Sequence, residues 1–150
     1  MQASFTIPTP QSVLVVIVII AIVLVAVLTI LILPVCLLRI DVSSEEVVVK
    51  APPMYSFSAK RGEVVEIFVA DLNVWSDLKP NLRTWGHGLP GYSLGWFKLK
   101  NGAKAFCAIS SDVAVVFKLS DGKYLLVTPS NLNDFISTLQ EVFGWSIIAR

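Results

Sequence analysis

The sequence has few of the side chains on which enzyme and metal chemistry depend. It contains one histidine, His87, and two cysteines, Cys36 and Cys107, among 150 residues. A metal site needs more ligands than these, and no second motif gathers a nucleophile or a base around the single histidine. We therefore expect no metal site and no cofactor, and we expect that the protein is not an enzyme.

The sequence also lacks an excess of charge of either sign. It has 12 basic and 11 acidic side chains, which give a formal net charge of +1. Such a balance gives no reason to expect nucleic acid as a partner. Cys36 lies at the end of a long apolar stretch and Cys107 in a predicted strand, so the two cannot easily pair and do not indicate a redox compartment.

Charge is missing altogether from residues 1–38, and every Lys, Arg, Asp and Glu lies from Arg39 onward. Residues 13–38 form an apolar stretch, and a helix over it is about 39 Å long, more than the hydrocarbon thickness of about 30 Å. In lipid, a single segment satisfies its backbone groups only as a helix. The sequence therefore predicts a tail at residues 1–12, a transmembrane helix at 13–38, a linker at 39–44 and a folded domain at 45–150.

A cleaved signal peptide is the main alternative for this apolar stretch. A signal peptide has a basic start, a shorter apolar core and a small-residue cleavage site, and these features are missing here. We expect a single-pass anchor. No Lys or Arg precedes the span, whereas Arg39 and Lys50 follow it closely. This asymmetry favours a cytoplasmic C-terminal domain.

From residue 45 onward, short β-prone segments alternate with turn residues, which is typical of a small barrel or sandwich. The pattern predicts about seven strands. Residues 130–143 change to helical spacing, with Ser130 as the candidate cap, and predict a C-terminal helix that closes the domain. The expected core combines both parts: Phe97, Leu99, Phe106, Val115, Phe117, Phe135, Ile136 and Leu139.

The clearest local element is a hairpin around Asn101-Gly102, a dipeptide typical of tight two-residue turns. With such a turn, Lys98 lies opposite Ala105, and Lys104 lies on the face opposite Lys98 and Lys100. Phe97 and Phe106 then share the core face. A second hairpin is predicted around Asp121-Gly122.

The segment "GHGLPG" at residues 86–91 matches the glycine spacing of a dinucleotide-binding turn. That turn needs a buried strand before the glycines and a helix after them. Here a polar segment precedes the glycines and the strand-like "YSLGWFKL" follows. We expect an irregular loop before an edge strand, and no dinucleotide.

Two segments, "RTWGHGLPGYSLGWFKLKNG" and "DGKYLLVTPSNLNDFISTL", resemble the prokaryotic PH-like family known as the bacterial PH domain. The resemblance covers about residues 45–143. The matching residues are Gly86, Gly88, Pro90, Gly91, Tyr92, Gly95, Phe97, Asn101, Gly102, Asp121, Gly122, Pro129, Phe135 and Ile136.

The resemblance implies a mainly-β barrel or sandwich capped by a C-terminal helix, often attached to a membrane span. It implies no established catalytic residues and no agreed ligand. The first turn of the last helix is usually acidic in this family, but here it contains Asn131, Asn133 and Asp134. Better-known PH domains bind inositol phosphates through a basic pocket near the first strands. Because that region has only Lys50, with Lys60 and Arg61 further on, we do not expect such binding.

Aromatic residues in and beside the glycine-rich segment, among them Trp75, leave three interpretations open: core cover, interfacial anchors or a protein-binding patch. The lysines of the hairpin suit either a solvated edge or contact with anionic headgroups. We expect a membrane-anchored interaction or scaffold module, which suits an accessory subunit of a larger membrane assembly. The alternative is a module that binds lipid headgroups or a small ligand. The expected partners are membrane lipid and another membrane protein. The candidate contact residues are Trp85, His87, Leu89, Tyr92, Trp96, Lys98 and Lys100.

Overall fold

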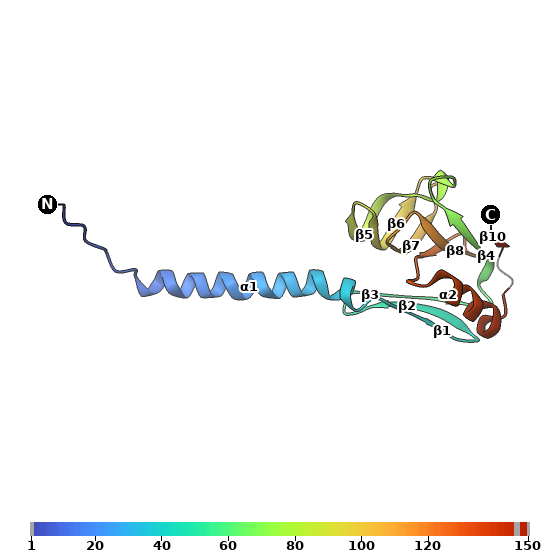
Figure 1. Cartoon of the computed structure of the whole chain (residues 1–150), viewed down its shortest axis with the longest axis horizontal. Coiled ribbons are helices and arrows are strands. Elements are labelled where there is room, and N and C mark those ends of the chain that lie inside the picture. The colour runs from blue at the N-terminus through green and yellow to red at the C-terminus, as the bar shows by residue number, and fades with distance from the viewer. Residues whose placement is uncertain (1, 146–147, 150) are drawn as a thin grey trace.

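The computed structural model describes residues 2–145 and 148–149, which form one long helix and a β-rich domain at its C-terminal end (Figure 1). Helix α1 spans Gln11–Cys36 and is the one helix among the described residues that is long and apolar enough to cross a membrane. Its single hydroxyl group beyond the first turn, on Thr29, donates to the Val25 carbonyl at 2.8 Å, so this polar side chain is satisfied within the helix.

The domain begins almost directly after α1. Strand β1 (Arg39–Val42) pairs antiparallel with β2 (Glu46–Ala51), which pairs with β3 (Tyr55–Lys60) to form a three-stranded sheet. The structure thus has a strand where the sequence suggests a linker at residues 39–44. The reason is packing, because Ile40 and Val42 are partly buried against the domain core.

A seven-stranded sheet makes up the rest of the domain, in the order β10-β4-β8-β9-β7-β6-β5. The pairs β10–β4 and β7–β9 are parallel and the other neighbours are antiparallel. The short 3-10 helix η1 (Ser76–Leu78) connects β4 to β5. The strands are β4 (Val64–Asp71), β5 (Pro80–Leu89), β6 (Tyr92–Leu99), β7 (Lys104–Ile109), β8 (Val113–Leu119), β9 (Tyr124–Val127) and β10 (Ile148–Ala149).

Buried side chains form two clusters on the two faces of this sheet. One contains Phe106 and Phe117 and is covered by the three-stranded sheet and the C-terminal helix. The other contains Phe97 and Leu99 together with Leu78 of η1. The prediction that Phe97 and Phe106 share a face is therefore wrong.

The C-terminal helix consists of α2 (Leu132–Thr138) followed by a π-helical turn, η2 (Leu139–Phe143). Leu139 and Phe143 are fully buried. The cap is Asn131 and not Ser130 as predicted, because the extended Asn131 backbone lets its side-chain oxygen accept the Asp134 N–H at 3.3 Å.

The β6–β7 hairpin has a turn one residue longer than predicted. The Leu99 N–H donates to the Ala103 carbonyl at 2.8 Å, so Lys100, Asn101 and Gly102 form a three-residue loop. Gly102, at φ +87°, is its left-handed third residue. The extra residue shifts the register, so that Lys98 lies opposite Lys104 and Trp96 lies opposite Phe106. The predicted pairing of Lys98 with Ala105 is therefore wrong.

Candidate interaction surface

The residues expected to form an irregular loop belong to a regular hairpin. Strand β5 ends at Leu89, which lies opposite Tyr92, and the chain turns through Pro90 and Gly91. β5 is the edge strand of the seven-stranded sheet. The loop prediction is wrong because the glycines here permit strand pairing instead of interrupting it.

Gly86 of β5 and Gly95 of β6 lie opposite each other and explain this pairing. A Cβ atom at Gly86 would lie 2.2 Å from the Leu94 carbonyl oxygen, and one at Gly95 would lie 2.4 Å from the Trp85 carbonyl oxygen. Both residues also have positive φ, +151° and +119°. The two glycines therefore allow a close approach of two backbones. A strand, β6, follows them where a dinucleotide-binding turn would have a helix.

The hairpin places most of the candidate contact residues on one face. Trp85, His87 and Leu89 alternate along β5 and face the same way. Their cross-strand partners Trp96, Leu94 and Tyr92 share that face. A bulge between Arg83 and Trp85 places Leu82 on the same face, opposite Lys98. This hairpin face continues the cluster that contains Phe106.

Strand β3 covers the inner part of the hairpin face. Phe57 packs edge-on against Trp96 and stacks on Phe106, with ring centroids 5.3 Å apart in both pairs. The Tyr55 hydroxyl lies 3.1 Å from His87 Nδ1. Trp96, His87 and Tyr92 are partly buried by these contacts. Of the three interpretations of the aromatic residues, packing over the hydrophobic core thus fits Trp96.

The outer part of the hairpin face is open to solvent. Leu82, Trp85 and Leu89 are 58%, 60% and 67% exposed. Large apolar side chains that follow one another along an edge strand are costly to leave in water and typically mark a contact surface. Trp75 lies elsewhere and packs against Phe68 of the other cluster, with ring centroids 6.2 Å apart.

Two tyrosines at the border between the covered and open parts stay protonated at neutral pH. Burial raises the pKa of Tyr55, and the Arg83 charge opposes the shift. Burial also raises the pKa of Tyr92, and the thiol group of nearby Cys36 at the end of α1 raises this pKa further. The hydroxyl of Tyr92 and Nε2 of His87 are buried without a hydrogen-bond partner among the described residues.

The lysines on the hairpin face form a second feature. Lys98 and Lys104 lie directly opposite each other, and Lys104 Nζ lies 4.7 Å from the centre of the Trp96 ring. Lys100 is exposed in the adjoining turn. Like charges at opposed positions destabilise a sheet. Protection of a sheet edge does not explain them, because β6 and β7 lie inside the sheet.

The charge around these lysines is one-sided. Residues 79–111 contain Lys79, Arg83, Lys98, Lys100 and Lys104 and no Asp or Glu. Arg83 lies opposite Phe97 and belongs to the other sheet face. On the hairpin face, three neighbouring strands present a row of Leu82, Lys98 and Lys104 beside the row of Trp85 and Trp96. We call Leu82, Trp85, Lys98 and Lys104 the docking surface.

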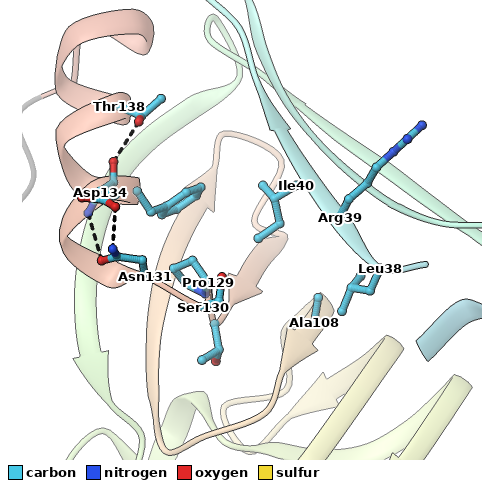
Figure 2. A pocket seen from close by; sticks show the side chains of 11 residues that line it. Leu38, Arg39, Ile40, Ala108, Pro129, Ser130, Asn131, Asp134 and Thr138 are labelled. Carbon is cyan, nitrogen blue, oxygen red and sulfur yellow. Dashed lines mark hydrogen bonds between the residues drawn. The ribbon is translucent and has the colours of Figure 1, made fainter. Parts of the chain in front are cut away.

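A pocket of about 420 Å³ lies between the start of β1 and the first turn of α2 (Figure 2). Most of the polar side chains that line it already have partners. Asn131 and Asp134 bond to each other, and Thr138 donates to the Asp134 carbonyl at 2.8 Å. Arg39 points away from the pocket and lies 3.8 Å from Asp41. Without converging polar groups, the pocket does not have the features of a specific ligand site.

The cysteines and acidic residues do not form a centre of their own. Within residues 2–145 and 148–149, no group of three His, Cys, Asp or Glu side chains is placed to hold a metal ion. Cys107 is fully buried, and burial raises the pKa of its thiol, which makes it a poor nucleophile.

The fold and this surface define a small PH-like β domain, capped by a helix and attached to a long apolar helix. The family model of the bacterial PH domain matches residues 59–143, more than half of the chain. The protein therefore belongs to the bacterial PH domain family. Strands β1 and β2 lie before the matched segment. No curated protein and no solved structure matches the chain.

Proposed function

We propose that the protein is a membrane-anchored interaction module whose PH-like domain binds another membrane protein through the docking surface. This proposal rests mainly on one observation: exposed Leu82 and Trp85 lie on the same sheet face as the opposed pair Lys98 and Lys104. The domain has no enzymatic role in this proposal and can serve as an accessory subunit of a larger assembly.

The junction between α1 and the domain supports an uncleaved anchor. Pro34 is buried, and Leu38 packs against the core cluster. Only Leu37 and Leu38 separate the helix from β1. Cleavage after α1 would therefore remove a side chain, that of Pro34, which is buried in the folded protein. The basic residues Arg39 and Lys50 at this junction favour a cytoplasmic domain.

The charge of the docking surface indicates the chemistry of the partner. With Lys98 and Lys104 side by side and no acidic side chain of its own, the docking surface is complementary to an acidic segment. Leu82 and Trp85 then require apolar side chains beside the acidic ones. Trp is also among the residues that contribute most to protein–protein binding.

A protein partner accounts for the lysines better than lipid headgroups do. Strand β6 runs from Tyr92, near Cys36 of α1, to Leu99, and the turn after it is held beside η1 by bonds from Lys100 and Asn101. Lys98 lies six residues from Tyr92, which is about 20 Å along a strand. Because charges in solution are screened over about 8 Å, headgroups near α1 act only weakly at this distance.

The substitution Lys98→Glu tests the proposal, because it separates binding from stability. The new carboxylate would face Lys104, so we expect the domain to gain about 0.2–1 kcal/mol. Binding of an acidic partner should weaken by about tenfold or more, because a repulsive charge replaces an attractive one. The control is Lys60→Glu, which makes the same charge change on the three-stranded sheet; its new carboxylate lies opposite Glu46 and should lower stability.

The measurement is recovery of a stoichiometric partner with the full chain in mild detergent, together with the stability of each variant. Loss of the partner with Lys98→Glu and its retention with Lys60→Glu would support the proposal. Equal recovery with both variants would contradict it. A monomer that retains lipid and no protein would favour the alternative, a headgroup-binding module.

A further inference from the structure

The end of the domain nearest α1 includes two short turns without charge, and the β7–β8 turn with Asp112 lies beside the second of them. One contains residues 52–54, between β2 and β3, and the other contains residues 89–91, the last residue of β5 and the two that connect it to β6. The pairing of Arg39 with Lys50 brings the end of β2 beside the start of β1, close to the end of α1. Figure 1 shows the β5–β6 turn on the side of the domain that faces α1. We call these the membrane-side turns.

The residues of the membrane-side turns can leave water at a low cost in free energy. They contain Pro52, Pro53, Met54, Leu89, Pro90 and Gly91, all exposed and none charged. Three of the six are prolines, which have no backbone N–H to desolvate. Leu89 is the most exposed of the apolar residues on the hairpin face, at 67%.

The length of α1 and its connection to the domain hold these turns at the membrane. A helix of 26 residues is about 39 Å long, so it extends past a hydrocarbon layer of about 30 Å into the headgroup region. Strand β1 begins three residues after Cys36 and leaves no flexible segment that could lift the domain away. The near end of the domain must therefore lie at the level of the headgroups.

We propose that the membrane-side turns enter the interfacial layer of the bilayer next to α1 and fix the orientation of the domain. This inference rests on α1 spanning the membrane, as the proposed function states. Arg39 and Lys50 lie at the same end and both contact Asp41, at 3.8 and 3.4 Å, which leaves one positive charge in excess within this group of three. With the turns in the lipid, the docking surface stands above the membrane and faces sideways, toward a neighbouring membrane protein.

The test places an environment-sensitive fluorophore on the full chain in vesicles of phosphatidylcholine with a minor share of phosphatidylglycerol. The label is attached to Leu89→Cys in a background of Cys36→Ser and Cys107→Ala. The matched control is Val74→Cys, since Val74 is an apolar residue that is 78% exposed in the segment between β4 and η1. Neither labelling substitution removes a buried side chain.

We expect the label at position 89 to be quenched by nitroxide groups on the lipids and shielded several-fold from aqueous iodide. The label at position 74 should show the opposite pattern. Equal exposure of both labels to iodide, in vesicles that retain the chain after an alkaline wash, would overturn the inference and leave the anchor intact. Loss of the chain in that wash would overturn the anchor and the inference together. Neither result depends on Lys98. The Lys98→Glu experiment therefore tests the docking surface independently of the membrane-side turns.

Discussion

Replacing Gly95 by Ala should unfold the hairpin that carries the docking surface. The new Cβ would lie 2.4 Å from the Trp85 carbonyl oxygen and 2.7 Å from the Gly86 Cα. The backbone φ of +119° is also strained for any residue with a Cβ. The strain costs about 1–3 kcal/mol. Separating β5 from β6 by the distance needed also weakens neighbouring hydrogen bonds, each worth about 1 kcal/mol. We expect a total loss of about 3 kcal/mol or more.

The control for this substitution lies in the same hairpin. At Gly88, a Cβ would meet its nearest atoms, on Arg83 and Phe97, at 3.8 Å, which is an ordinary contact. Gly88→Ala should therefore be neutral or stabilise the domain by up to about 1 kcal/mol, because alanine loses less backbone entropy than glycine. Both variants are compared by chemical denaturation in detergent with tryptophan fluorescence. Equal stability of the two variants would refute the role of the glycine pair.

Three further predictions concern other parts of the chain. Intact-mass measurement of membrane-extracted protein should show that α1 is present, and a mature N terminus between residues 25 and 45 would rule out the anchor. In a Cys36→Ser variant, Cys107 should stay unreactive toward maleimide at neutral pH until denaturant is added, since it is fully buried and burial raises the pKa of its thiol. Fast labelling of the folded protein would show that the core cluster around Cys107 is open to solvent. Asn131→Ala should lower stability by about 1 kcal/mol, because it removes the acceptor for the Asp134 N–H, and an unchanged melting temperature would show that this cap is not needed.

The overall architecture could be predicted because it depends on simple patterns. The absence of charge before Arg39 is sufficient to locate an apolar helix of membrane length, since no detail of packing is involved. Helical spacing from Leu132 to Phe143 identified the closing helix, and the buried Leu139 and Phe143 follow from that spacing. The PH-like class followed from the sequence motifs and is confirmed by the family match.

The register of the β6–β7 hairpin could not be predicted, because it depends on one residue in the turn. An Asn-Gly pair suits both a two-residue turn and a three-residue loop with glycine in last place. The choice decides whether Lys104 lies opposite Lys98 or on the other face. For this reason the sequence does not predict the lysine pair, which is half of the docking surface.

Strand β5 was hidden for a different reason. Gly86, Gly88 and Pro80 normally argue against a strand, and local propensity gives no sign that Gly86 will meet a second glycine across the sheet. The signal that could have found it is Gly95 inside an otherwise clear strand, which indicates a close backbone approach. Strand β1 was assigned to a linker because four residues of strand next to an apolar helix leave no periodic signal.

A photo-cross-linking residue at position 85 would show directly what the docking surface contacts in the membrane. It replaces Trp85 in the full chain, with the same residue at exposed Val74 as control, and the membranes are irradiated before extraction. We expect an adduct from position 85, and not from position 74, with a separate membrane protein through a segment rich in Asp and Glu. The adduct should also disappear when Lys98→Glu is added. Adducts with lipid alone, or the same protein adduct from both positions, would show that the docking surface does not bind a protein partner.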